Sequence, residues 1–93
     1  MMYDLDFHPS ALKEWKKLDS VIREQFKIKL AERLQNPRIA SAQIEKNRYK
    51  IKLRCVGYRL VYEVRDNELV IMVIAVGKRE RSEVYRLADS RKS

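Results

Sequence analysis

The chain has 93 residues, of which 45% are apolar, so its core is large enough for one domain and too small for two. Its 21 basic and 13 acidic residues give a net charge of +8. Residues 46–93 hold 13 basic and 6 acidic residues, so this half carries +7 of the total. We therefore expect residues 1–93 to form a single basic domain with a polyanionic partner, either nucleic acid or an anionic membrane.

Two further features restrict the class of protein. The only cysteine is Cys55, which excludes an intrachain disulfide and a cysteine-based zinc site and suits a reducing cytosol. The longest apolar run, residues 69–76, is far shorter than the roughly 20 residues that cross a bilayer. The sequence thus predicts a soluble, cytoplasmic protein that makes no use of a membrane.

The first half of the chain predicts one strand and two helices. Residues 2–7, MYDLDF, alternate apolar and polar side chains, as in a short strand. Pro9 then marks the start of a short amphipathic helix, in which three apolar residues recur at a spacing of three: Leu12, Trp15 and Leu18. His8 precedes this helix as a capping or surface residue.

A second, longer helix follows almost at once. Either Asp19 or Ser20 provides the N-cap, and Asn36 and Pro37 end the helix. Its apolar residues form an i, i+4 row: Ile22, Phe26, Leu30 and Leu34. Because the connection is so short, the two helices should form an antiparallel hairpin whose shared apolar face packs on a sheet.

The second half predicts that sheet. In YKIKLR, residues 49–54, apolar and basic side chains alternate, and the same period continues in YRLVYEVR, residues 58–65. Residues 69–76 are apolar throughout, as expected for a central strand covered on both faces. Residues 80–91 can form a last short helix that packs through Val84, Leu87 and Ala88. The sequence therefore predicts an α+β fold: a strand, a helical hairpin, a three-stranded antiparallel meander that completes a mostly antiparallel sheet, and a short C-terminal helix.

Basic side chains concentrate on one face of the predicted sheet. Because like charges on neighbouring strands destabilise a sheet, this cluster favours binding of an external anion such as RNA phosphate over a merely solvated face. The cluster is expected to contain Lys50, Lys52, Arg54, Arg59, Lys78, Arg79 and Arg81. Tyr85 follows within one or two helical turns, where it either packs or takes part in chemistry.

The residue types limit the chemistry available at this cluster. His8 is the only histidine, which excludes catalysis by paired histidines, and the basic half has no carboxylate cluster with metal-ligand spacing. No phosphate-binding glycine loop or serine nucleophile motif is present. Transesterification by the 2'-hydroxyl of RNA remains, with lysine, arginine and tyrosine side chains that position the phosphate and stabilise its charge. Neighbouring cations would lower the high pKa values of tyrosine and lysine.

Four blocks, ALKEWKKL, YKIKLR, GYRLVYEV and VGKRERSEVY, closely resemble the RelE family of bacterial toxins over nearly the whole chain. The resemblance implies the RelE-like microbial ribonuclease fold and the toxin of a type II toxin-antitoxin module. It implies an endoribonuclease that needs no metal or other cofactor and cleaves mRNA in the ribosomal A site, leaving a cyclic phosphate and a 5'-hydroxyl. Free toxins of this kind cut naked RNA poorly.

The resemblance also assigns roles to individual residues. Tyr85 would be the general base on the 2'-hydroxyl, with Lys52 as its helper or its replacement. Arg79 would stabilise or protonate the leaving oxygen, and Lys50 and Arg59 would hold the phosphate. Contacts with the 16S rRNA backbone are expected from a second set: Lys46, Arg48, Arg54, Lys78 and Arg81.

The family further implies a RelB-like antitoxin that wraps the toxin and shifts or disorders the last helix, moving Tyr85. Binding of operator DNA by the toxin-antitoxin complex stays open. One departure from the family is the segment before Tyr49, which lacks glycine and looks shorter by a couple of residues. Two alternatives remain: a non-catalytic RNA or ribosome binder, and the gyrase-inhibiting ParE branch, which lacks this lysine, arginine and tyrosine set.

Overall fold

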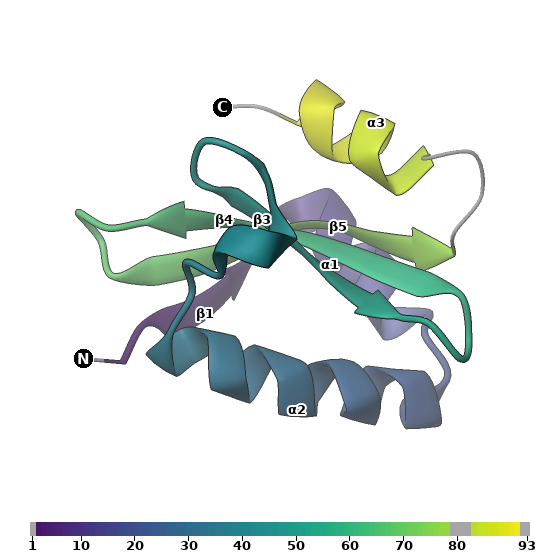
Figure 1. The fold of residues 1–93 in the computed structure, drawn as a ribbon. Helices are drawn as coiled ribbons and strands as arrows, with labels where there is room; N and C mark the ends of the chain where they lie inside the picture. Colours follow the sequence, from purple (N-terminus) through teal and green to yellow (C-terminus); the bar gives the residue numbers. More distant parts are fainter. Residues whose placement is uncertain (1, 79–82, 92–93) are drawn as a thin grey trace.

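A computed structural model describes residues 2–78 and 83–91, which form one five-stranded sheet with helices on both faces (Figure 1). α1 and α2 lie against one face, and α3 lies across the other. In chain order the elements are β1 (Asp4–Phe7), α1 (Pro9–Lys16), α2 (Ser20–Gln35), the 3-10 helix η1 (Ala40–Ala42), β2 (Gln43–Glu45), β3 (Arg48–Leu53), β4 (Tyr58–Arg65), β5 (Val70–Lys78) and α3 (Glu83–Ser90).

The strand order is β1-β5-β4-β3-β2. β1 runs parallel to β5, with Asp4 opposite Val70, and all other pairs are antiparallel. This confirms the mostly antiparallel sheet with β5 in its interior. The predicted three-stranded meander was incomplete, because β2 adds a fourth antiparallel strand at the edge. β2 has only three residues and is exposed, so it carries no alternating apolar pattern.

Side-chain caps start both helices of the hairpin. His8 accepts a hydrogen bond from the backbone N–H of Ser10, which confirms its capping role, and Pro9 occupies the first turn of α1. Asp19, rather than Ser20, caps α2 by accepting from the N–H of Val21.

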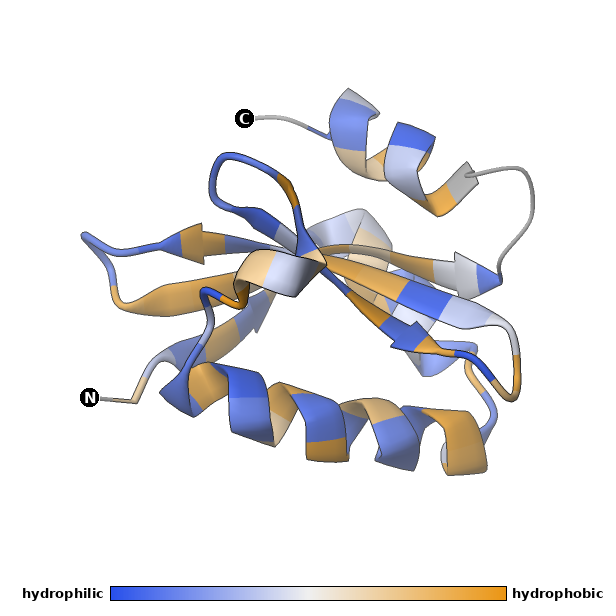
Figure 2. Cartoon of the chain, in the orientation of Figure 1, coloured by the Kyte–Doolittle hydropathy of each residue, from blue (hydrophilic) through white to orange (hydrophobic). Residues whose placement is uncertain are grey.

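The main core lies between the helical hairpin and the sheet. Phe26 and Leu30 are completely buried, and the rest of the predicted row on α2 is partly buried, so this row is confirmed. Hydrophobic residues alternate with hydrophilic ones along α2 and along the strands β3 and β4 (Figure 2). The expectation for Leu12 was wrong, because its side chain is 37% exposed. α1 contacts the sheet through Ala11 and Trp15, a spacing of four residues, which turns Leu12 outward.

A second, smaller cluster lies under α3. Val84 and Ala88 pack on Val61 and on two successive residues of β5, Ile74 and Ala75. A β-bulge brings both of these residues to this face, since Val61 pairs with Ala75 while Tyr62 pairs with Val73. The predicted contacts of the last helix are thereby confirmed.

The start of β5 differs from the prediction. Leu69 was expected in the buried strand, but it has a positive φ of 54° and is 38% exposed. Leu69 belongs to the turn that follows Arg65. A hydrogen bond from the Leu69 N–H to the Asp66 carbonyl closes this turn. Among the described helices, none is long and apolar enough to cross a membrane.

Candidate functional site

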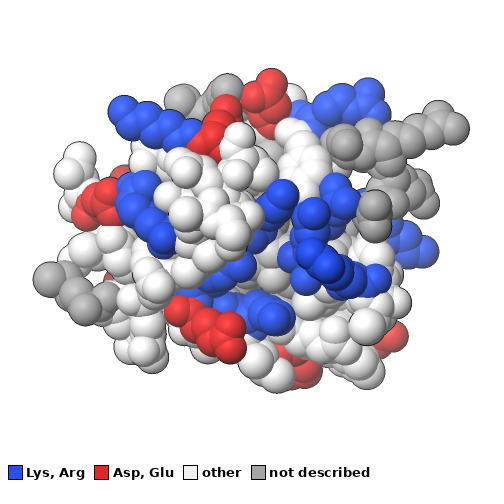
Figure 3. Space-filling model, viewed as in Figure 1, with Lys and Arg blue, Asp and Glu red and all other residues white. Residues whose placement is uncertain are grey.

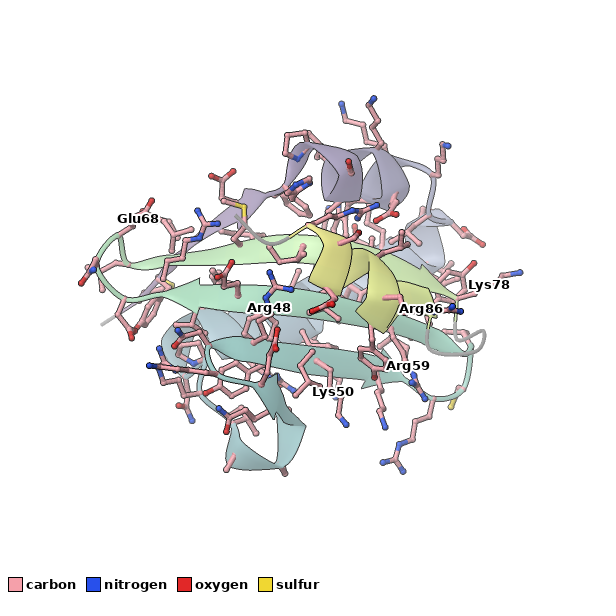
Figure 4. The ribbon with its side chains drawn as sticks, turned by 90° about the horizontal axis from the view of Figure 1, so that it is seen from above. Arg48, Lys50, Arg59, Glu68, Lys78 and Arg86 are labelled. Carbon is pink, nitrogen blue, oxygen red and sulfur yellow. The ribbon has the colours of Figure 1, made fainter. Side chains whose placement is uncertain are left out.

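A cavity of about 470 Å³ lies between α3 and the β2–β3 side of the sheet. Its walls combine residues from β2, β3, β4 and α3, and most of the charged ones are basic. The lining residues are Ile44, Glu45, Arg48, Lys50, Lys52, Arg59, Tyr85, Arg86, Ala88 and Asp89. Viewed from above the sheet, Lys50 and Arg59 lie beside α3, which carries Arg86, whereas Glu68 lies at the far end of the sheet (Figure 4).

The alternation of β3 places the lysines in this cavity. Ile51 and Leu53 are buried against the hairpin side, so Lys50 and Lys52 project from the opposite face. Lys52 pairs across the strands with Arg59 of β4, which brings two positive charges side by side. Lys and Arg side chains accordingly gather in the centre and right of the space-filling view, beneath α3 (Figure 3).

The lysine and arginine side chains also border two smaller cavities. One, of about 300 Å³, includes Lys52, Arg54 and Arg59 in its lining, and the other, of about 240 Å³, includes Arg33, Lys50, Lys52 and Arg54. Neither of these two cavities has an acidic residue in its wall. Lys52 therefore lies where three cavities meet, each lined by cations.

Arg59 and Tyr85 contact each other at the centre of the site. The guanidinium carbon of Arg59 lies 5.2 Å from the centroid of the Tyr85 ring, within the range of a cation–π interaction. The Nε of Arg59 is buried and has no hydrogen-bond partner among the described residues. Because a buried donor without a partner is costly, the Arg59 guanidinium is suited to an anionic ligand that compensates its charge.

The cations change the acid–base properties of Lys52. Repulsion from Lys50 is the largest cause that lowers the pKa of Lys52 below its ordinary value of 10.5, followed by partial desolvation and repulsion from Arg59. A larger fraction of the amine is therefore neutral at a given pH, and a neutral amine can accept a proton. Lys52 therefore binds a proton less tightly than an isolated lysine does.

Arg48 anchors α3 above this cavity. Its side chain is only 5% exposed, and its Nη1 donates to the Ala88 carbonyl at 2.6 Å, near the C-terminal end of α3. Its Nε lies 3.6 Å from Glu45. A cation at this end of a helix also compensates the negative end of the helix dipole. This burial argues against the predicted contact of Arg48 with rRNA, since the guanidinium is already used inside the protein.

The structure brings together four of the five predicted catalytic residues: Lys50, Lys52, Arg59 and Tyr85. The fifth, Arg79, lies outside the described residues, as does Arg81. Lys46 and Arg54 are exposed in turns, and Lys78 is exposed at the end of β5. These positions leave the predicted rRNA contacts of Lys46, Arg54 and Lys78 possible in geometry, and their roles stay predictions.

Sequence reasoning missed other residues of the cavity. Arg86 and Asp89 come from α3, and Ile44 and Glu45 from the unpredicted strand β2. The helical spacing of four between Tyr85 and Asp89 was the available signal on α3. Within the described ranges, no three His, Cys, Asp or Glu side chains gather closely enough to hold a metal ion.

These features define a class of protein: a small basic α+β domain with a cation-lined cavity suited to a phosphodiester. Comparison with known proteins identifies the family. Residues 5–83 match the family described as "ParE toxin of type II toxin-antitoxin system, parDE". The chain therefore belongs to this family of type II toxins.

Full-length relatives favour the RelE branch of this family. The chain is 57% identical to the "mRNA interferase toxin RelE" of Escherichia coli K12 and to the "mRNA interferase RelE" of Shigella flexneri, over 98% of each chain. Although the matching family carries the name ParE, identity at this level over the whole length supports the predicted resemblance to RelE.

Solved structures agree with the RelE-like fold. The structure of a double mutant of E. coli RelE in the free state matches with a TM-score of 0.91 at 54% identity, covering 100% of both chains. The toxin in the intact E. coli RelBE toxin-antitoxin complex matches with a TM-score of 0.81 at 56% identity, over 85% of this chain and 99% of that one.

Proposed function

We propose that this toxin is a ribosome-dependent endoribonuclease that cleaves mRNA in the ribosomal A site and so inhibits translation. The observation that carries the proposal is the convergence of Lys50, Lys52, Arg59 and Tyr85 on one cavity. The name mRNA interferase, borne by relatives that are 57% identical, supports the same activity.

The reaction is a transesterification that needs no metal ion. The 2'-oxygen of the RNA attacks the adjacent phosphorus, the new bond gives a 2',3'-cyclic phosphate, and the bond to the 5'-oxygen breaks. A base takes the proton of the 2'-hydroxyl, and an acid or a cation neutralises the 5'-oxygen. Positive side chains hold the non-bridging oxygens, on which negative charge increases in the transition state.

The residues of the cavity supply these functions. Tyr85 acts as the base, either together with Lys52 or replaced by it. Lys52 is suited to this part because its lowered pKa makes the neutral amine more accessible. Lys50 and Arg59 hold the phosphate. Arg79, assigned from the sequence, stabilises or protonates the leaving oxygen.

The ribosome supplies the rest of the binding surface. Lys46, Arg54 and Lys78 are exposed around the site, where they would contact the 16S rRNA backbone together with Arg81. Such contacts increase affinity without reading sequence, so the ribosome presents the mRNA and determines where it is cut. We place this activity in the cytoplasm, where ribosomes translate mRNA.

A RelB-like antitoxin is the proposed inhibitor, supported by the solved RelBE complex of E. coli. α3 is held by two small buried side chains, Val84 and Ala88, and a few polar contacts, so a partner helix could displace it together with Tyr85. Hydrogen exchange would test this mechanism, since equal protection of residues 83–90 in free and bound toxin would contradict it. The toxin-antitoxin complex is also a candidate to bind operator DNA.

Primer extension on an mRNA held in programmed ribosomes tests the activity. The wild type should cut at the A-site codon only when ribosomes are present, and Tyr85→Phe and Arg79→Ala should abolish the cuts. Tyr3→Phe is a matched control, because Tyr3 lies away from the cavity and bonds to Asp66. Ribosome binding without cuts, unchanged by these variants, would support the non-catalytic binder instead.

A further inference from the structure

Among the described residues, no strand lies beside the second half of β5 on the β1 side. β1 ends at Phe7, opposite Val73, and the chain then turns into α1. Two side chains occupy this edge instead. Glu14 of α1 accepts a hydrogen bond from the Val76 N–H at 3.2 Å, and Arg91 donates to the Ile74 carbonyl at 2.9 Å.

The same two side chains bind each other. The Nη1 and Nη2 atoms of Arg91 donate to the two carboxylate oxygens of Glu14 at 2.9 and 3.0 Å, in a bidentate pair. We call Glu14, Arg91 and the two β5 backbone groups the edge clamp. Side-chain exposures of only 14% for Arg91 and 25% for Glu14 separate it from an ordinary surface pair such as Lys27–Glu24, at 54% and 65%.

The edge clamp fixes the C-terminal end of α3. Arg91 follows α3 directly, and its backbone N–H donates to the Ala88 carbonyl. Arg48 donates to this same carbonyl from β3. α3 is therefore held from two sides at one end, by Arg48 from the sheet face and by Arg91 from the edge of β5.

α3 depends on such anchors. It has eight residues, fewer than the roughly 12–15 that an isolated helix needs to be even marginally stable in water. Its buried apolar side chains, Val84 and Ala88, are small. Tyr85 is six residues before Arg91, which corresponds to about 9 Å along a helix axis. A shift at the clamped end is thus passed by a short rigid helix to the Tyr85 ring.

We propose that Glu14 and Arg91 are positioning residues for Tyr85: the edge clamp docks α3 so that the tyrosine lies over Arg59 in the cavity. The inference rests on the proposed function, because it assigns the clamp to the geometry of that same site. Neither Glu14 nor Arg91 lines the cavity, so their effect on cleavage must pass through α3.

Glu14→Gln and Arg91→Gln test the clamp in the full chain. Gln at position 14 keeps an oxygen for the Val76 N–H and removes the charge that binds Arg91, so the edge of β5 itself is preserved. Glu24→Gln makes the same change in the exposed pair on α2 and serves as the control. Hydrogen exchange at residues 84–90 should become about tenfold faster in both clamp variants and stay unchanged in the control. Exchange in β3 and β4 should stay unchanged in all three variants. Tenfold corresponds to about 1.4 kcal/mol.

Cleavage should follow the docking of α3. At saturating ribosomes the single-turnover rate should fall about tenfold in each clamp variant, with ribosome affinity unchanged. The NMR signals of the Tyr85 ring should shift in both clamp variants and stay unchanged in Glu24→Gln, because only the clamp variants move the residue that acts on RNA. If Glu14 and Arg91 merely stabilised the fold, the clamp variants would lower the unfolding temperature without any effect on Tyr85.

The two proposals can fail separately. Exchange rates and the NMR signals of the Tyr85 ring need no RNA, so they test the clamp even if the wild type does not cut. Unchanged exchange and ring signals in Glu14→Gln and Arg91→Gln would overturn the clamp while leaving the ribonuclease intact. Faster exchange with an unchanged cleavage rate would overturn the positioning role.

Discussion

The Tyr62 hydroxyl joins α2, the segment after it and the core of the sheet, and its removal should destabilise the fold. The hydroxyl accepts from Arg33 Nη1 at 2.8 Å and donates to the Pro37 carbonyl at 2.7 Å, and the residue is completely buried. Burial raises the pKa of Tyr62, so the hydroxyl keeps the proton that it donates. In Tyr62→Phe the buried carbonyl loses this donor, while Arg33 keeps its bond to the Lys50 carbonyl.

The expected loss is about 2 kcal/mol, within the roughly 1–3 kcal/mol typical of an unsatisfied buried polar group. Each kcal/mol shifts the melting temperature of a domain this size by about 4–8 °C, so Tm should fall by about 8–16 °C. Urea unfolding followed by Trp15 fluorescence would measure it. Tyr3→Phe removes an exposed hydroxyl that bonds to Asp66 and should cost less than about 0.5 kcal/mol. Equal losses in the two variants would refute the reasoning.

Two predictions concern pH. Lys50→Met removes the largest cause of the lowered Lys52 pKa, so an NMR titration should find the Lys52 pKa raised toward 10.5. The control Lys13→Met on α1 should leave the Lys52 pKa unchanged. An unchanged Lys52 pKa in Lys50→Met would contradict the assigned cause. Asp66 accepts from Tyr3 and Arg38, and these bonds, that of Tyr3 first, hold its pKa below 3.8. The contribution of Asp66 to stability is therefore present above pH 3.8 and is lost as the pH falls through the lower folded-state pKa. In unfolding measurements, Asp66→Asn should therefore reduce the loss of stability at acid pH. An unaltered loss would assign it to other carboxylates.

The parts of the fold that follow a strict period were predictable from sequence. The row from Ile22 to Leu34 repeats every four residues, and only a helix buries such a row on one side. The alternation around Lys50 and Lys52 likewise fixed which face of β3 is basic. Within the site, Lys50, Lys52, Arg59 and Tyr85 were found because pattern and family resemblance agreed.

What sequence missed depends on contacts between distant residues. Nothing local distinguishes Arg48, which is buried and binds the Ala88 carbonyl, from its exposed neighbour Lys46. The pairing of Glu14 with Arg91 spans 77 positions and is equally invisible to periodicity. Leu12 was assigned to the wrong side of α1 because three apolar residues at a spacing of three outweighed Ala11, whose small side chain allows close packing on the sheet.

The parallel pairing of β1 with β5 also bears on how the toxin is made. Asp4 cannot contact Val70, nor can Glu14 contact Arg91, until the later residue of each pair has left the ribosome, because synthesis begins at the N-terminus. Contacts of such long separation close slowly, since the loop entropy must be overcome before they form. A growing chain therefore has its helical hairpin long before it has a docked α3, and the cavity that contains Tyr85 is completed only after Arg91 has emerged from the ribosome.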